Sequence, residues 1–314
     1  MTRKIIIDCD PGIDDAIAIC IALFDPRVEV LAITPTTGTI DAAQATTNVT
    51  GIVGLLDPPR YPRIGTANPI DDASVFDDNH LHGHDGLGGI GFQQSGRQHQ
   101  ASSDKVISEL VNQHPNEITL LCLGPLTNLA RLCRRDPTTI PLLNNVVISG
   151  GSVTHPGNAT TSAERNFFFD PVSASEVFAS ATTKSLVPLD VTEEVCFGVE
   201  LLEQLPSKFS RAGALLHKLL PFAFRTAHQH LGRELIPLYD PTALMSVLEP
   251  DLFTWEEMAG KVEAQGELTR GSTVFDQRLR REWPVNMEVA TAVDVSEVTA
   301  AIIRGLRYAG QRSE

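Results

Sequence analysis

The stretch KIIIDCDPGIDDAIAICIALF, residues 4–24, has the pattern of a buried strand, a tight turn and a helix in direct succession. Residues 4–9 are rich in isoleucine and apolar on both faces, which is typical of a strand in a covered parallel sheet. Pro11 and Gly12 then predict a turn. From residue 14 the pattern is apolar and helical, with two acids in its first turn. This succession predicts the first strand–helix unit of an α/β fold.

The same stretch carries four carboxylates, on Asp8, Asp10, Asp14 and Asp15, with no Lys or Arg among them. Asp8 and Asp10 point the same way from an extended strand, because side chains alternate. One acid at a helix N-terminus is favourable by about 0.3–1 kcal/mol, so helix capping is an alternative role for one of them. Four close carboxylates repel one another unless some protonate or a cation binds. A hard divalent cation takes such oxygen ligands, and the stretch therefore predicts a metal site.

Strand and helix patterns alternate along the first two thirds of the chain. They predict an α/β fold with an open, mainly parallel, doubly wound sheet flanked by helices. Residues 198–250, in the C-terminal third, have a helical pattern and are predicted to form a helical insertion, and we expect one domain over 1–314. The predicted strands are 4–9, 28–34, 118–123, 146–149, 185–189 and 287–293, with a hairpin over 261–267 and 272–275; the predicted helices are about 14–24, 41–56, 104–113, 126–134, 171–180 and 298–308.

The composition is that of a globular protein that does not bind polyanions. Of the 314 residues, 42% are hydrophobic and 20% are charged, and the formal net charge is −14. This charge opposes binding to a nucleic acid polymer or an anionic membrane surface. No segment has the ~18 consecutive apolar residues of a membrane span, and the N-terminus has no signal-peptide pattern. The five cysteines include no C-x-x-C pair, so we expect free thiols in a reducing cytoplasm.

Two further polar clusters carry candidate functional residues. The segment HPGNATTSAERNFFFDP, residues 155–171, follows a predicted strand, and its amide and acidic groups suit the vicinal hydroxyls of a sugar. A polar surface loop with a helix cap at Asp170 is the alternative. The segment PLYDPTAL, residues 237–244, contains an Asp-Pro pair that often marks only a helix start. Asp240 is a further metal ligand only if the fold brings it beside the first acidic cluster. Ligands of open α/β sheets bind beyond the carboxyl ends of the strands, where Asp10 lies.

The ordered set of motifs resembles the nucleoside hydrolases, calcium-dependent enzymes that cleave the N-glycosidic bond of ribonucleosides. The resemblance spans essentially the whole chain, and DCDPGIDDA is its most specific element. It implies an open α/β sheet, a Ca²⁺ cofactor, a small nucleoside or riboside as substrate and a homodimer or homotetramer. The motifs that carry it are DCDPGIDDA near the N-terminus, HGHDGLGG at 82–89, LGPLTNLA at 123–130, GNATTSAERN at 157–166 and YDP at 239–241.

The resemblance also implies a role for each matching residue. Asp10 would be the general base on a metal-bound water, which attacks the sugar and releases ribose and the free base. The implied Ca²⁺ ligands are the carboxylates of Asp10, Asp15 and Asp240 and the backbone carbonyl of Leu123; the implied ribose-binding residues are Asp14, Asn158, Glu164 and Asn166.

The chain departs from the family pattern where the base would lie. Many members have a histidine immediately before the last metal aspartate, and this chain has Tyr239, a poorer acid at neutral pH. Arg165 stands where a substrate-packing phenylalanine is frequent, and Thr39 stands where an asparagine near the ribose is usual. We expect both to border the substrate. His82, at a family histidine position, is the candidate substitute acid. The sugar side is thus nearly intact and the base side is altered.

Other functions fit parts of the sequence. The altered base side is also compatible with a catalytically weak ribose- or nucleoside-binding protein, or with a ribosidase for a non-standard base. A haloacid dehalogenase-type phosphatase would explain IIIDCD, but Pro-Gly replaces the Gly-Thr that should follow. The histidines at 80, 82 and 84 lack a further ligand for zinc. Gly86–Gly91 fits G-x-G-x-x-G but follows a polar loop instead of a strand, which argues against a dinucleotide site.

Overall fold

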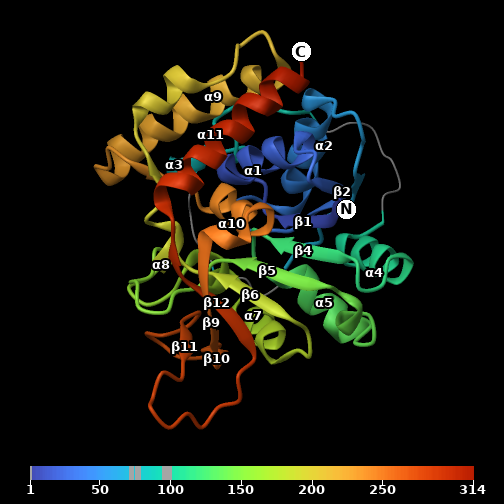
Figure 1. Cartoon of the computed structure of the whole chain (residues 1–314), viewed down its shortest axis with the longest axis vertical. Helices are drawn as coiled ribbons and strands as arrows, with labels where there is room; N and C mark the ends of the chain where they lie inside the picture. The colour runs from blue at the N-terminus through green and yellow to red at the C-terminus, as the bar shows by residue number, and fades with distance from the viewer. Residues whose placement is uncertain (1, 71–73, 75–78, 94–100) are drawn as a thin grey trace.

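The computed structural model describes residues 2–70, 74, 79–93 and 101–314. Its central sheet comprises β1 (Arg3–Cys9), β2 (Val28–Pro35), β3 (Arg63–Ile64), β4 (Ile118–Cys122), β5 (Asn145–Ser149), β6 (Lys184–Val187), β9 (Phe253–Met258) and β12 (Met287–Val293). The strand order is β3-β2-β1-β4-β5-β6-β12-β9 (Figure 1). Neighbouring strands run parallel except β9, which pairs antiparallel with β12. The predicted open, mainly parallel sheet is confirmed.

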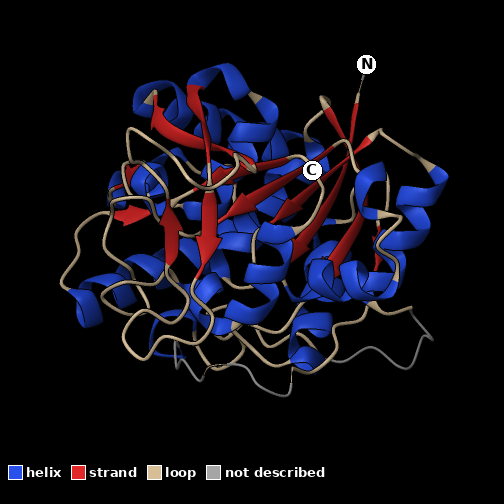
Figure 2. Ribbon diagram, turned by 90° about the horizontal axis from the view of Figure 1, so that it is seen from below, coloured by secondary structure: helices blue, strands red, loops and turns tan. Residues whose placement is uncertain are grey.

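Helices cover both faces of this sheet (Figure 2). One layer packs α1 (Ile13–Phe24), α9 (Arg211–Thr226), α10 (Tyr239–Leu248) and α11 (Val295–Arg312) against one another, and α2 (Ala42–Leu56) contacts α9. The other layer packs α4 (Ser103–Gln113), α5 (Thr127–Arg135) and α7 (Pro171–Ala179) together. The arrangement is the doubly wound one that the alternating pattern predicts.

The isoleucines of β1 show why this strand is apolar on both faces. Ile5 and Ile7 lie in the core under α1, whereas Ile6, between them, lies in the core on the opposite side of the sheet. All three side chains are fully buried. Because alternate residues of a strand face opposite sides, a strand between two helix layers has to be apolar at every position.

The C-terminal third matches its prediction in part. The helical insertion consists of η2 (Val199–Gln204), α9, η3 (Ala227–Leu231) and α10, and the predicted hairpin is formed by β10 (Gly260–Val262) and β11 (Thr273–Phe275). The sequence prediction missed β9, which is an edge strand. Its residues Thr254, Glu256 and Glu257 are exposed, and these charged and polar residues hide the strand pattern.

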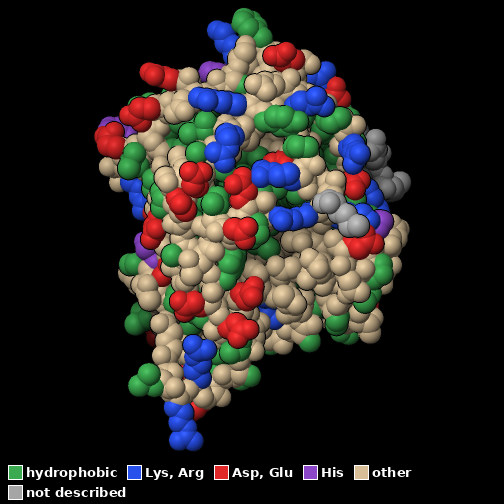
Figure 3. Space-filling model, in the orientation of Figure 1, with side chains coloured by type: hydrophobic (Ala, Val, Ile, Leu, Met, Phe, Trp, Pro, Cys, Tyr) green, Lys and Arg blue, Asp and Glu red, His purple; other side chains and the backbone are tan. Residues whose placement is uncertain are grey.

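The surface and the cysteines agree with the composition. Acidic and basic side chains are interspersed over the face in Figure 3, and the segment that projects at the bottom of the view carries Lys and Arg side chains at its tip. None of the described helices is both long enough and apolar enough to cross a membrane. All five cysteines are free, and Cys9, Cys20 and Cys122 are buried.

The strand order places the polar motifs together. The chain leaves β1 toward β2 on one side and reaches β4 on the other, so the strand order reverses at β1. In open α/β sheets this switch point leaves a crevice beyond the carboxyl ends of the strands. Asp10 directly follows β1 and Leu123 directly follows β4, and both therefore face this crevice.

Candidate active site

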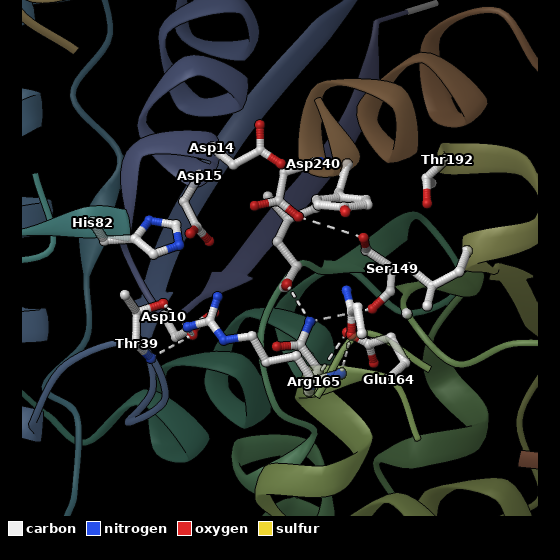
Figure 4. Close-up of a pocket in the computed structure, with 16 residues that line it drawn as sticks. Asp10, Asp14, Asp15, Thr39, His82, Ser149, Glu164, Arg165, Thr192 and Asp240 are labelled. Atoms are coloured by element: carbon white, nitrogen blue, oxygen red, sulfur yellow. Dashed lines mark hydrogen bonds and ion pairs between the residues drawn. The ribbon is translucent and has the colours of Figure 1, made fainter. Parts of the chain in front are cut away.

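A cavity of about 90 Å³ lies at the carboxyl ends of β1, β4 and β5 (Figure 4). The fold brings every predicted site residue to its wall. They come from segments up to 230 positions apart: Asp10, Asp14, Asp15, Thr39, His82, Leu123, Asn158, Glu164, Arg165, Asn166, Tyr239 and Asp240. Ser149, Gly150, Leu189 and Thr192, which the sequence did not single out, complete the lining.

The Asp10 carboxylate is fixed by close contacts with neighbouring loops. Its Oδ2 accepts hydrogen bonds from the backbone N–H of Thr39 at 2.7 Å and from the Thr39 hydroxyl at 2.8 Å. A Cβ atom on Gly38 would lie 2.2 Å from Asp10 Oδ2, and one on Gly124 would lie 2.5 Å from Asp10 Oδ1. Both positions therefore need glycine because the carboxylate occupies the space of a side chain.

Three other carboxylates meet beside the start of α10. Asp14 Oδ2 accepts a hydrogen bond from the backbone N–H of Asp240 at 2.9 Å, so an acid from α1 caps the first turn of α10. Asp15 Oδ2 accepts from the backbone N–H of Gly12 at 2.9 Å. The second oxygens of Asp14 and Asp15 are buried and have no hydrogen-bond partner. Capping therefore accounts for one oxygen of each acid and leaves the other oxygen without a structural role.

The charges of this cluster are costly in the absence of a cation. Burial raises the pKa of Asp14 to about 7 and also raises the pKa of Asp10. Burial, reinforced by repulsion from the neighbouring acids, holds the pKa of Asp15 and of Asp240 well above the usual range. The guanidinium of Arg165 opposes all four shifts. The cluster therefore favours either protonation or a bound cation.

The donor set fits a hard divalent cation, although the side chains are not yet gathered around one point. Among the described residues, no three acidic, histidine or cysteine side chains already converge as a metal centre. Asp10 is turned toward Thr39 and Arg165, and the Leu123 carbonyl accepts a hydrogen bond from Asn166 Nδ2 at 2.8 Å. Asp14 and Asp15 nevertheless line the cavity, and each keeps one buried carboxylate oxygen without a hydrogen-bond partner. Oxygen donors are the ligands that Ca²⁺ prefers.

The 158–166 loop supplies its polar groups from a hydrogen-bonded frame. Glu164 caps α6 (Arg165–Phe169) by accepting from the backbone N–H groups of Asn166 and Phe167. Its Oε2 also accepts from the backbone N–H of Gly151 at 3.0 Å. Asn158 Oδ1 accepts from the backbone N–H of Arg165 at 2.9 Å. Asp170 caps α7, as the alternative interpretation of this segment expected. The loop therefore has structural caps and also presents polar groups to the cavity.

A second cavity of about 510 Å³ adjoins the first, and Asp14, His82, Asn158, Arg165 and Tyr239 line both. In it, Tyr239 Oη donates a hydrogen bond to Glu193 Oε1 at 2.6 Å, and Arg233 Nη1 lies 3.0 Å from Glu193 Oε2. Burial and the charge of Glu193 raise the pKa of Tyr239 well above its usual value. Sequence reasoning missed Glu193 and Arg233. The available signal was the position of Glu193 directly after α8 (Leu189–Thr192), the short helix that follows β6.

His82 reaches the cavity from α3 (Asn79–His82), which packs against α9 and η3. Burial, with the nearby charges of Arg165 and His80, lowers the pKa of His82 to about 3. Its imidazole is therefore neutral at neutral pH. The glycine-rich segment that follows turns around Asp85, whose carboxylate accepts from the backbone N–H groups of Leu87, Gly89 and Gly91. This segment is a structural loop beside the site.

Asp8, the remaining acid of the first motif, supports the sheet. It is fully buried and does not line either cavity. Its Oδ1 accepts hydrogen bonds from the Thr34 hydroxyl at 2.6 Å and from Asn128 Nδ2 at 2.8 Å. It thereby links β1 to β2 and α5 below the site.

Sequence comparison places this arrangement among known enzymes. The model of the inosine-uridine preferring nucleoside hydrolase family matches residues 5–300. The chain is 33% identical over 306 residues to the non-specific ribonucleoside hydrolase RihC of Salmonella enteritidis PT4 (strain P125109), covering 97% of this chain and 98% of that protein. It is 31% identical over 322 residues to the inosine-uridine preferring nucleoside hydrolase of Leishmania major, covering 99% of each.

Solved structures give the same result. A plant nucleoside hydrolase, PpNRh1, superposes with a TM-score of 0.91 and 28% identity, covering 98% of this chain and 99% of that chain. A purine-preferring ribonucleoside hydrolase from Gardnerella vaginalis superposes with a TM-score of 0.89 and 27% identity, covering 99% of each chain. These similarities extend over nearly the whole length of the chain.

Proposed function

Because the chain belongs to the family of inosine-uridine preferring nucleoside hydrolases, we propose that it is a Ca²⁺-dependent hydrolase of ribonucleosides, releasing ribose and the free base. Family membership makes it a hydrolase of N-glycosyl compounds. One observation carries the finer proposal: the buried acids and the sugar-type hydrogen-bonding residues line the same cavity. The acids are Asp10, Asp14, Asp15 and Asp240, and the polar partners are Asn158, Glu164 and Asn166.

The metal would be held by the acids of the cluster. Asp10, Asp15 and Asp240 would bind it through their carboxylates, and Leu123 would bind it through its carbonyl. When bound, Ca²⁺ supplies positive charge that relieves the repulsion of the acids, lowers the pKa of a coordinated water and accepts the oxygens of a sugar diol. The unpartnered oxygen of Asp15 and the raised pKa values of Asp15 and Asp240 support this assignment.

Asp10 is the general base of the proposed reaction. Its carboxylate takes a proton from the attacking water, and the water oxygen bonds to the anomeric carbon while the C–N bond breaks. The bonding electron pair leaves with the base. Positive charge develops on the sugar ring, and the surrounding carboxylates stabilise it as in other glycoside hydrolysis. The glycine contacts and the two hydrogen bonds from Thr39 hold Asp10 in one position for this task.

The ribose would lie between the acids and the 158–166 loop. Asp14 has one free buried oxygen, and we assign it with Asn158, Glu164 and Asn166 to the ribose hydroxyls. Thr39 and Arg165 lie beside Asp10 and would border the sugar. The base would then extend into the second cavity, where Tyr239 and His82 are the candidate contacts to it.

The test is release of reducing sugar from a panel of ribonucleosides with added Ca²⁺, comparing the wild type with Asp10→Asn. We expect hydrolysis by the wild type and a rate about 10²–10⁴-fold lower for the variant, because the base is lost while the shape is kept. Equal background rates for both proteins would contradict the proposal.

We also propose that the enzyme works in the cytoplasm as a homodimer or homotetramer. The five free thiols, three of them buried, support a reducing compartment. The assembly rests on the family resemblance, and light scattering coupled to size-exclusion chromatography tests it. A mass equal to one chain of 34.0 kDa would contradict the assembly.

A further inference from the structure

The second cavity contains a hydrogen-bonded group of three residues that sequence reasoning did not connect. Glu193, directly after α8, accepts a hydrogen bond from Tyr239 Oη at 2.6 Å and lies 3.0 Å from Arg233 Nη1. The Glu193 side chain is only 12% exposed, whereas that of Arg233 is 43% exposed. Tyr239 directly precedes Asp240, and it lines both cavities. The group therefore stands where the sugar-side cavity meets the second cavity.

The direction of the Tyr239 hydrogen bond limits what this residue offers a substrate. A phenol has a single proton, and in this structure Tyr239 directs it to Glu193 Oε1. Hydrogen bonds to charged acceptors are among the stronger ones in proteins, so the proton is held firmly. The Tyr239 oxygen in turn accepts hydrogen bonds from the side chains of Asn158 and Arg233, so Tyr239 offers the cavity no free donor.

We propose that Glu193 is a positioning residue that sets leaving-group selectivity. It accepts the hydrogen bond from Tyr239 and thereby keeps the phenol proton directed away from the departing base. This inference rests on the proposed function. The inference implies that the wild-type enzyme prefers ribosides whose leaving group departs without a hydrogen bond or proton from Tyr239. In the reaction, the C1′ bond to the leaving group breaks and its electron pair leaves with that group, while Asp10 takes the proton of water. A nucleobase that needs a hydrogen-bond donor to stabilise the negative charge it acquires on leaving therefore gains little from Tyr239.

Glu193→Gln tests this orientation. The guanidinium of Arg233 is a donor only, so it retains the amide oxygen and leaves the amide NH₂ facing the Tyr239 oxygen. The Tyr239 proton then turns toward the cavity. Two substrates report the change: inosine, whose base leaves poorly without a donor, and p-nitrophenyl riboside, whose leaving group is a stable anion. We expect the ratio of kcat for inosine to kcat for p-nitrophenyl riboside to rise about tenfold, as one gained transition-state hydrogen bond allows.

Three comparisons separate this role from a structural one. Glu194→Gln is the matched control, because Glu194 is the exposed acid next in sequence, and its ratio should equal that of the wild type. Glu193→Ala also frees the proton and should raise the ratio in the same direction. In a Tyr239→Phe background, Glu193→Gln should no longer change the ratio, because the proton it redirects is absent.

Each outcome decides the inference. A ratio unchanged in both Glu193 variants, or a full effect of Glu193→Gln that persists in the Tyr239→Phe background, overturns it. Hydrolysis of neither substrate by the wild type contradicts the proposed function itself. Hydrolysis with an unchanged ratio contradicts only the role of Glu193.

Discussion

Arg165 Nη2 lies 3.8 Å from Asp10 Oδ2, and the same nitrogen donates a hydrogen bond to the Thr39 hydroxyl at 2.5 Å. A cation of the chain itself thus reaches the buried acid cluster (Figure 4). It partly neutralises the acids and therefore lowers their attraction for another cation. This relationship distinguishes the site from a set of carboxylates with no basic neighbour.

Replacing Arg165 by methionine should tighten Ca²⁺ binding, because the acids then lose a competing positive charge. We expect an affinity about tenfold higher, which corresponds to about 1.4 kcal/mol. Isothermal titration calorimetry with Ca²⁺ alone measures it. Arg134→Met is the control, since Arg134 pairs with Glu176 on the surface, away from the cavity. An Arg165 variant that binds Ca²⁺ no more tightly than the wild type would show that the guanidinium does not compete.

Replacing Gly124 by alanine should displace Asp10 and reduce kcat. The new Cβ would lie 2.5 Å from Asp10 Oδ1 and 2.8 Å from the Asp10 backbone nitrogen, so the carboxylate has to move. Misplacing a reacting group costs about 10²-fold in rate. The matched control is Gly54→Ala in α2, where the Cβ would meet nothing within 4 Å. Steady-state kinetics and thermal melting of both variants check the prediction, which fails if Gly124→Ala keeps the wild-type kcat.

Asp190 should stabilise the fold through the 153–155 loop. Its carboxylate accepts from the backbone N–H groups of Val153, Thr154 and His155 at 2.7, 2.7 and 3.0 Å. Burial alone would raise the pKa of Asp190, but these hydrogen bonds and one from the Thr154 hydroxyl hold it below the usual value. The stabilisation is therefore present above the unfolded pKa of ~3.9 and is lost as the pH falls through the folded value.

Asp190→Asn should accordingly lower the free energy of unfolding at pH 7 by about 1–3 kcal/mol, because the amide cannot accept all of these bonds. Urea unfolding of the wild type and the variant measures the difference at several pH values. The difference should begin to shrink below pH ~4, where Asp190 takes up a proton in the unfolded chain, and should be lost as the pH falls through the lower pKa of the folded carboxylate. A difference that stays constant from pH 7 to about pH 2 would mean that the carboxylate charge is not what holds the loop.

The fold and the convergence of the acidic and polar motifs at one cavity were predictable from the strand and motif patterns of the sequence. The apolar run of β1 specifies a covered strand, and DCDPGIDDA puts four acids at its carboxyl end. Strand ends of a parallel sheet meet at one edge, so Asp10, Leu123 and Asn158 converge by topology alone. By contrast, β9 was missed because an edge strand with exposed glutamates lacks the apolar pattern.

The network around Tyr239 depends on side-chain direction, which the sequence does not reveal. Glu193 and Arg233 are 40 positions apart, and in sequence each resembles an ordinary surface charge. Likewise, nothing in the sequence around Arg165 indicates that its guanidinium turns toward Asp10. The direction of a long side chain is decided by tertiary contacts, which only the folded structure supplies.

The most direct test of the central claim is the rate of riboside hydrolysis by chelator-treated protein as Ca²⁺ is added back, measured for the wild type and Asp10→Asn. We expect the wild type to be inactive without metal and its rate to rise to a plateau as Ca²⁺ is added. The variant should stay about 10²–10⁴-fold slower at every Ca²⁺ concentration that supports wild-type activity. Full activity of the wild type in excess chelator, or equal rates for the two proteins at saturating Ca²⁺, would contradict it.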